Sequence, residues 1–249
     1  MARTARKLSH TGIYHVMLRG INKQQIFFDE EDHLIFLHEL NKFREVCHYE
    51  VYAYCLMRNH IHLLLKVGDV PLGEIFKRIG VSFVLWYNTK YQRVGHLFQD
   101  RFKSEAVEDD RYFMTVLRYI LNNPVKAKIC SAAEDYRFSS AAEYVRQAKG
   151  ITDTGFALRM TSREQFIRFL HEKNDDQCME DEQTAPNKVT DREAARLIMA
   201  EFGTMQPDPG KKATRVPFAN SVNKLRQQGV SVRQFCRLTG LSKNIVERC

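Results

Sequence analysis

The chain has 249 residues, of which 44% are hydrophobic and 27% are charged, and its formal net charge is +8 at pH 7. This composition is typical of a globular protein, and no apolar run approaches the length that spans a bilayer. The basic N-terminus is not followed by an apolar stretch of the kind found in signal peptides, so a cytoplasmic location is expected. The six cysteines include no CxxC pair, which argues against a local zinc site.

The positive charge is distributed unevenly along the chain. Residues 172–186, EKNDDQCMEDEQTAP, contain six acidic residues and one lysine. This segment therefore carries −5, and the rest of the chain carries +13. A strongly basic chain with one acidic segment favours a polyanionic partner, although a basic surface kept for solubility also explains the charge.

The first half of the chain alternates between strand and helix patterns. A short strand is expected at 12–20. A helix follows at 29–49, where apolar side chains recur at helical spacing behind an acidic first turn. The members of this apolar stripe are Leu34, Leu37, Leu40 and Val46. Two strands are expected at 50–57 and 59–67, joined by a tight connection at Arg58 and Asn59.

Alternation along 50–57 assigns its side chains to two faces. One face is expected to hold Val51, Ala53 and Cys55, and the other Tyr52, Tyr54 and Leu56. The remaining elements of this region are a helix from 71 to about 91, a strand at 101–110 and a helix at 110–123 that stops at Pro124. The order of elements predicts an α+β fold, in which helices cover one face of an antiparallel sheet.

The composition changes after about residue 150. A helix at 162–171 and the acidic linker are followed by a helix with a capping box at Thr190 and Glu193 and a stop at Gly203. We therefore expect a catalytic domain at 1–149, a helix and linker at 150–187, and an all-helical module at 188–249.

The end of this module resembles a helix-turn-helix. Ser231 and Gln234 form a capping pattern for a first helix, and Gly240 provides the turn. Ser242 then caps a second helix, as in a DNA-reading motif, although ordinary helical hairpins share this spacing. The side chains expected on its recognition face are Lys243, Asn244 and Arg248.

The sequence HIHLLLK places His60 and His62 on the same face of a strand. Ile61 and Leu63 face the opposite way, as expected of core residues. Two imidazoles in this arrangement can bind one metal ion, but for the pair alone we favour the other interpretation, two partly buried histidines that are hydrogen-bonded. A further ligand is needed to favour the metal.

The helix at 110–123 offers such a ligand. Its core face is expected to consist of Phe113, Met114, Leu117, Ile120 and Leu121. Tyr119 and Asn123 lie one turn apart on the opposite arc, which could cover the histidine face. Two imidazoles and an amide oxygen would leave open positions on a divalent ion, which could polarise a phosphate oxygen. A positioned tyrosine could then attack phosphorus.

Several blocks of the sequence, in order, resemble one family. NHIHLLLKV resembles the His-hydrophobe-His motif of the HUH endonucleases. YHVMLRGINKQQIFFDEEDH, GHLFQDRFKSEAVEDDRYFMTVLRYILNNPVKAKIC and YRFSSAAEY resemble the branch with a single tyrosine, transposases of insertion sequences. Within that branch, the resemblance is to the REP-associated tyrosine transposases, over about residues 10 to 145.

This resemblance implies a ferredoxin-like fold and a metal-dependent enzyme that cuts and rejoins single-stranded DNA, often beside a hairpin. Tyr119 matches the nucleophile, which forms a 5′-phosphotyrosine bond and leaves a 3′-OH. His60, His62 and Asn123 match the ligands of Mg²⁺ or Mn²⁺. Many relatives have a histidine where this chain has Leu121. Relatives include both monomers and homodimers, so the oligomeric state stays open.

Basic residues and aromatic residues interleave around these blocks, a pattern suited to single-stranded DNA. The residues expected to bind DNA in the catalytic domain are Arg19, Gln99, Arg101, Lys103, Arg118 and Lys126. The alternative is a catalytically silent, repressor-like DNA-binding protein on a transposase-derived fold. Either protein would be cytoplasmic, associated with the nucleoid when bound to DNA, and without a membrane partner.

Overall fold

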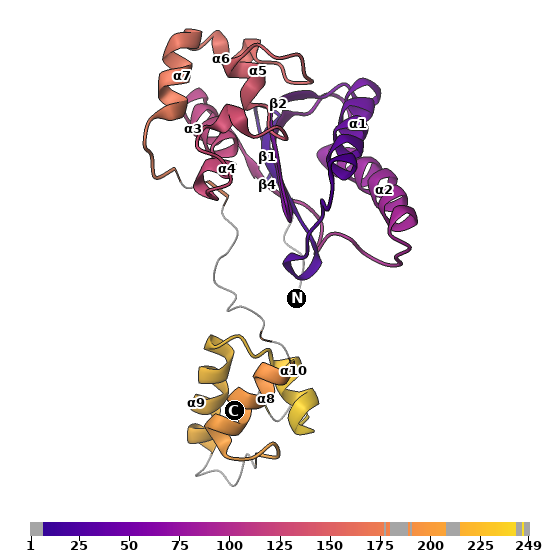
Figure 1. The fold of residues 1–249 in the computed structure, drawn as a ribbon, viewed down its shortest axis with the longest axis vertical. Helices are drawn as coiled ribbons and strands as arrows, with labels where there is room; N and C mark the ends of the chain where they lie inside the picture. The colour runs from indigo at the N-terminus through magenta and orange to yellow at the C-terminus, as the bar shows by residue number, and fades with distance from the viewer. Residues whose placement is uncertain are drawn as a thin grey trace. The chain divides into compact units, whose positions relative to one another are not determined.

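The structure is a computed structural model that describes residues 7–176, 178–179, 189, 191–207, 215–242 and 246. The chain divides into two compact units, residues 1–179 and 180–249 (Figure 1). In the part that is described, no helix is long and apolar enough to cross a membrane.

The first unit is built around a sheet and carries helices before, between and after its strands. Its strands are β1 (Ile13–Arg19), β2 (Glu50–Met57), β3 (His60–Lys66) and β4 (Lys103–Ala106). Its α-helices are α1 (Glu30–Cys47), α2 (Leu72–Lys90), α3 (Asp110–Leu121), α4 (Asn123–Lys126), α5 (Ala141–Val145), α6 (Gly155–Leu158) and α7 (Arg163–His171). Two short 3-10 helices are η1 (Ile21–Lys23) and η2 (Ala133–Asp135).

The four strands form one antiparallel sheet in the order β2-β3-β1-β4. Strands β2 and β3 are neighbours in sequence and in space, as expected from their tight connection. The other two connections skip a strand: α1 joins β1 to β2, and α2 joins β3 to β4. The fold is therefore an α+β arrangement with the element order β-α-β-β-α-β, and β1 and β3 lie at its centre.

Helices cover both faces of this sheet (Figure 1). Helices α1 and α2 pack over side chains such as Val16, Ile61 and Leu63, whereas α3 packs over the face that holds Leu64. The expectation that helices cover a single face is therefore wrong. The central strands carry apolar side chains on both sides, and each apolar face must be shielded from water.

Strand β2 does not keep a single alternation. Its pairing with β3 shifts between Val51 and Ala53, so Tyr52 is an extra residue, as in a β-bulge. Val51 consequently lies in the core beneath α1 and α2, whereas Ala53 and Cys55 lie in the core beneath α3. The expected grouping of Val51 with Ala53 and Cys55 is wrong because a bulge moves every later side chain to the other face.

Helix α1 buries only part of the expected stripe. Leu40 is fully buried as expected, together with Phe36, but Leu34 and Val46 are 47% and 54% exposed. The Phe36 ring packs edge-on against Phe83 of α2. Several faces of this helix carry apolar residues at helical spacing, and the bulky aromatic side chain is on the face that packs against α2.

Helix α3 ends earlier than expected and is followed by a new short helix. Its first turn is capped by Asp109, whose carboxylate accepts the N–H of Tyr112 at 2.7 Å. The helix stops at Leu121, and α4 begins at Asn123. Asn122, between them, donates from its side chain to the carbonyl oxygen of Leu170 at 2.8 Å, which ties this break to α7.

Helices α5, α6 and α7 pack on the first unit. Tyr144, Ala157 and Phe166 are fully buried in the same core as the inner side of α3. The residues from 150 to 171, which we expected to belong to a connecting segment, thus contribute to the core that holds α3 in place.

The described residues of the second unit form the helices α8 (Asp191–Phe202), α9 (Arg215–Gln227) and α10 (Val232–Thr239) around a small core of their own. Ser231 caps α10 by accepting the N–H of Gln234 at 3.1 Å, as the sequence predicts. Gly240 ends the helix with φ +77°, a conformation that glycine adopts without strain. Thr190, part of the expected capping box of α8, lies outside the described residues.

Candidate active site

Strand β3 presents two histidines toward α3. His60 and His62 lie opposite Ile61 and Leu63, whose side chains are buried beneath α1 and α2. The ring centres of His60 and His62 are 5.0 Å apart, and their planes meet at 87°. The two imidazoles therefore lie side by side on one face of the sheet, as the alternation predicts.

Helix α3 brings Tyr119 to this pair. The ring centre of Tyr119 lies 5.6 Å from that of His62, at an interplanar angle of 86°. The arc of Tyr119, opposite Phe113 and Leu117, is buried as well, and it covers the histidine face as the sequence suggests. Helix α3 contacts the strands β2 and β3 and the helices α4 and α7, which together shield side chains such as Tyr119 from solvent.

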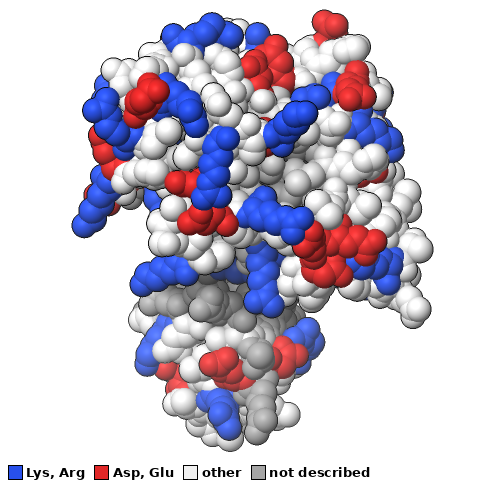
Figure 2. All heavy atoms as spheres, turned by 45° about the horizontal axis from the view of Figure 1, so that its top comes forward, with Lys and Arg blue, Asp and Glu red and all other residues white. Residues whose placement is uncertain are grey.

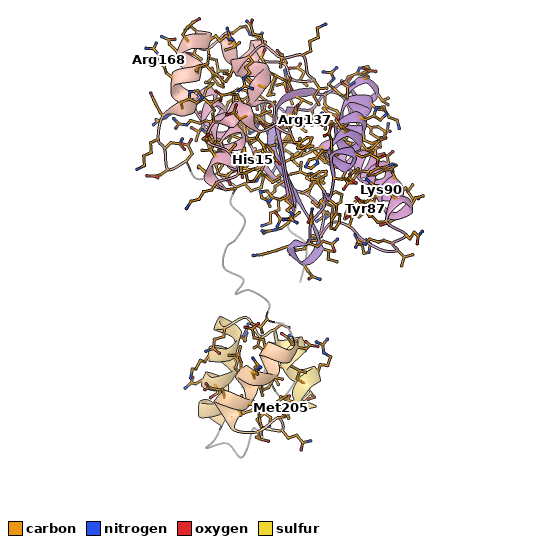
Figure 3. All side chains as sticks on the ribbon, viewed as in Figure 1. His15, Tyr87, Lys90, Arg137, Arg168 and Met205 are labelled. Carbon is orange, nitrogen blue, oxygen red and sulfur yellow. The ribbon has the colours of Figure 1, made fainter. Side chains whose placement is uncertain are left out.

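A third histidine completes the cluster. His15, at the middle of β1, is fully buried, and its Nε2 lies 3.0 Å from Nδ1 of His62, a hydrogen-bond distance. Its ring centre is 5.9 Å from that of Tyr119. Figure 3 labels His15 on the α3 side of the sheet, away from Tyr87 and Lys90 of α2. His15 therefore contacts both His62 and Tyr119.

Burial lowers the pKa of two of these histidines. The pKa of His15 falls from its ordinary 6.5 to about 3 because the ring is removed from water. Burial also lowers the pKa of His62 well below 6.5, and the nearby charges of His15, His60 and Arg19 add to this effect. Both rings are therefore neutral at neutral pH, the state in which imidazole can bind a metal ion.

Asn123 and Lys126, in the short helix after α3, lie close to Tyr119. The side-chain amide of Asn123 donates to the backbone carbonyl of Tyr119 at 3.1 Å. The Lys126 ammonium lies 4.9 Å from the centre of the Tyr119 ring. The third member of the proposed ligand set, His60, contacts its neighbour in the chain: its Nδ1 lies 2.8 Å from the side-chain oxygen of Asn59.

Four of the residues expected to bind DNA lie on β1, β4 and the segment before β4. Arg19 is half-buried at the end of β1, directly opposite His60 in the neighbouring strand. Lys103 is exposed at the start of β4. Gln99 and Arg101 are exposed, and the backbone N–H of Gln99 donates to the carbonyl of Arg19 at 2.8 Å.

Gln99 and Arg101 also line a groove of about 920 Å³ beside α2. Phe76 and Phe102 contribute to its walls, with ring centres 4.6 Å apart. Residues of α2 form one wall of this groove, and α2 packs on the face of the sheet opposite to the one that Tyr119 covers. Gln99 and Arg101 are therefore brought together with each other, but in a groove bounded by α2 and not by α3.

Arg118 is held by a neighbouring carboxylate. Its guanidinium donates twice to Asp176, at 2.6 and 2.8 Å, and lies 3.9 Å from the centre of the Phe169 ring. Lys126 donates to the backbone carbonyl of the same Asp176 at 2.8 Å. The start of the acidic segment thus folds against two of the basic residues that we expected to contact DNA.

The remaining basic side chains are dispersed. Figure 2 shows Lys and Arg spread over the visible face of the larger unit, with patches of Asp and Glu between them. Lys243, Asn244 and Arg248, expected on the recognition helix, lie outside the described residues. Within the described ranges, no three His, Cys, Asp or Glu side chains are arranged to hold a metal ion.

Sequence reasoning missed His15, Glu105 and Asp176. His15 and Glu105 pair directly across β1 and β4, so their side chains share the face that holds His62. Alternation along 12–20 could have placed His15 on a polar face with Arg19. No local signal could have found Asp176, because it meets Arg118 across 58 residues of chain.

Part of the chain is similar to known proteins. Residues 9–123 match the family described as Transposase IS200 like. No curated protein matches the chain. Among solved structures, the chain is similar to a REP-associated tyrosine transposase bound to a REP hairpin. That similarity has a TM-score of 0.52 and 19% identity and covers 61% of this chain and 94% of the other.

A putative transposase from Deinococcus radiodurans R1 is a further match, with a TM-score of 0.34 and 15% identity over 51% of this chain and 92% of the other. The family match begins before β1 and ends at Asn123, so it includes both histidines of β3 and the tyrosine of α3. The chain therefore contains an IS200-like transposase domain.

Proposed function

We propose that the protein is a metal-dependent endonuclease and strand transferase for single-stranded DNA, with Tyr119 as its nucleophile. The observation that carries the proposal is the 5.6 Å contact between the rings of Tyr119 and His62, beside His60. A tyrosine held against two histidines, on the elements that match the transposase family, is the arrangement that such a reaction needs.

The residues present suit a divalent cation. His60 and His62 offer two imidazoles from one side of β3, and His62 has Nδ1 engaged by His15, which leaves Nε2 for a metal. Asn123 would add an amide oxygen, since its side-chain nitrogen is the atom that bonds to Tyr119. A bound Mg²⁺ or Mn²⁺ would polarise a phosphate oxygen and orient the ester.

The reaction follows from the position of the phenol. The Tyr119 oxygen attacks phosphorus and loses its proton to solvent, a new phosphorus–oxygen bond forms, and the bond to the 3′ oxygen breaks. The 3′ oxygen takes a proton and leaves as a 3′-OH, while the 5′ end stays attached as a phosphotyrosine. Because one phosphoester replaces another, a second 3′-OH can reverse the step without ATP.

The proposed substrate is a DNA hairpin with single-stranded flanks. Support comes from the fold, since a solved protein of similar fold is described as bound to a REP hairpin. The core that we infer is ferredoxin-like, in agreement with its β-α-β-β-α-β order. The second unit would read duplex DNA through a helix-turn-helix, as its capped α10 and the turn at Gly240 suggest.

The nucleophile can be tested by trapping the covalent adduct. The protein is incubated with a hairpin DNA and Mg²⁺ or Mn²⁺, and adducts that survive denaturation are detected. Tyr119→Phe should form none and should still bind DNA, because only the phenolic oxygen is removed. Tyr136→Phe is the matched control, since the hydroxyl of Tyr136 donates to the Leu56 carbonyl and takes no part in the proposed site.

The metal site is tested by calorimetry with Mn²⁺. His60→Ala and His62→Ala should each lower the affinity for Mn²⁺ and slow cleavage, because each removes a proposed ligand. Unchanged affinity in both variants would place the metal elsewhere. Hairpin binding by the wild-type protein without any adduct, in the presence of either metal, would instead support the repressor-like alternative.

A further inference from the structure

Strands β4, β1 and β3 bring a carboxylate and two imidazoles into one row. Glu105 pairs with His15 across β4 and β1, and the His15 ring then reaches His62 of β3. The Glu105 carboxylate lies 3.9 Å from Nδ1 of His15. The row therefore runs from Glu105, which is partly exposed, through the fully buried His15 to His62.

The hydrogen bond between the two rings contains one hydrogen, so one nitrogen donates and the other accepts. A neutral imidazole carries its hydrogen on one nitrogen only. If Nε2 of His62 binds a cation, the hydrogen of His62 must be on Nδ1 and be donated to Nε2 of His15. His15 must then carry its own hydrogen on Nδ1, on the side of Glu105.

The surroundings of His15 favour this arrangement. Among the described residues none forms a hydrogen bond with Nδ1 of His15, although the atom is buried. The Glu105 carboxylate is too far away for a direct hydrogen bond, but its negative charge attracts an N–H dipole at this nitrogen. Glu105 is itself held in place, since it accepts the backbone N–H of Met179 at 3.2 Å.

We propose that His15 is a positioning residue, which holds His62 in the tautomer and orientation that leave Nε2 free for a cation, and that Glu105 sets the tautomer of His15. Metal-binding histidines are commonly oriented in this way by the group that accepts their second N–H. The inference rests on the proposed function, because it assigns a metal to His62. It extends that function to two residues outside the proposed ligand set.

The first test uses the metal-free, full-length protein, so it does not depend on activity. Long-range ¹H–¹⁵N NMR spectra distinguish the two tautomers of each histidine, and a His62→Gln variant identifies the signals of His62. In the wild-type protein, His62 should carry its hydrogen on Nδ1. In His15→Phe, the fraction of His62 that carries its hydrogen on Nε2 should rise. A wild-type His62 that carries its hydrogen on Nε2 would overturn the proposal.

The second test measures Mn²⁺ affinity in the same proteins. His15→Phe should lower the affinity by about 10- to 100-fold, the usual effect of losing an outer partner of a metal ligand. His15→Gln should restore much of it, because the amide oxygen can accept the N–H of His62. A larger loss that glutamine does not restore would make His15 a ligand itself and would contradict the positioning role.

Two further variants keep the test decisive. Glu105→Gln removes a partly exposed charge and should shift the tautomer of His15 without unfolding the protein. An unchanged tautomer of His15 would show that Glu105 does not set it. His33→Phe is the matched control, because His33 is a buried histidine stacked between Phe27 and Phe138, away from the site. Its Mn²⁺ affinity should equal that of the wild type.

The results separate this inference from the proposed function. If the wild-type protein binds no Mn²⁺, the proposed metal site fails, and the role of His15 toward a metal fails with it, whatever the tautomer. If the wild type binds Mn²⁺ and His15→Phe binds it equally well, the proposed function stands and only the inference about His15 is wrong.

Discussion

The ammonium group of Lys126 lies 4.9 Å from the centre of the Tyr119 ring, and it also donates to the backbone carbonyl of Asp176 at 2.8 Å. The two partners hold the cation at the end of α4, the short helix that follows α3. A positive charge in this position stabilises negative charge that develops on the phenol or on an incoming phosphate.

Lys126→Gln should therefore slow adduct formation about two- to fivefold, the size expected for loss of an exposed cation over an aromatic ring. Single-turnover measurements of the covalent adduct would give the rate. Lys128→Gln is the control, since Lys128 is an exposed lysine two residues further on. Equal rates in the two variants would show that Lys126 does not act on Tyr119.

The ion pair between Arg118 and Asp176 should contribute mainly to stability. Both side chains are largely buried, with 13% and 11% exposed. Asp176→Asn should lower the free energy of unfolding by about 3 kcal/mol, because it removes the nearest carboxylate from a largely buried guanidinium. Chemical denaturation of Asp176→Asn, Arg118→Met and the double variant would measure the coupling between the two residues.

The same variants decide whether Arg118 also contacts DNA. If it does, Arg118→Met should weaken hairpin binding even in the Asp176→Asn background, where the ion pair with Asp176 is absent. Identical affinity with and without Arg118 in that background would remove this residue from the expected DNA-binding set.

The metal-free protein should lose stability as the pH falls below about 6.5. Burial lowers the pKa of His15 to about 3, so the folded state keeps this ring neutral while the unfolded chain protonates it near 6.5. The unfolded state then binds more protons, and the free energy of unfolding falls by about 1.4 kcal/mol per pH unit for one such histidine.

Denaturation curves between about pH 5 and 7 would measure this dependence, above the range in which ordinary carboxylates titrate. His15→Phe should show a shallower slope than the wild type, whatever its stability at neutral pH. A slope that does not change with this substitution would mean that His15 is not the group responsible.

Deleting residues 188–249 should weaken recognition of DNA more than it weakens the chemistry. The deleted segment forms a separate core, and the proposed catalytic residues all lie in the first unit. The shortened protein should still cut a hairpin at high concentration. Its binding should depend less steeply on salt, because fewer phosphates are contacted.

Titrations of both proteins on one duplex-flanked hairpin, at two salt concentrations, would provide the comparison. If affinity and salt dependence are the same with and without the C-terminal residues, the helices of the second unit do not bind this DNA.

Much of the site could be predicted from local pattern. Side chains alternate along a strand, so the sequence HIH predicts that His60 and His62 share one face, whatever the rest of the fold. The spacing of one helical turn likewise brought Tyr119 near Asn123, and their amide–carbonyl contact is present. The cap of α10 at Ser231 is local for the same reason, since its partner lies three residues away.

The sequence by itself determined which residues share a face, because the backbone repeats every 2 or 3.6 residues. Only the tertiary structure decided what covers each face. It placed Tyr119 against His62 and His15, and it joined His15 to His62 across 47 residues of chain. Contacts of this kind depend on how helices and strands pack to exclude water, which no local period encodes.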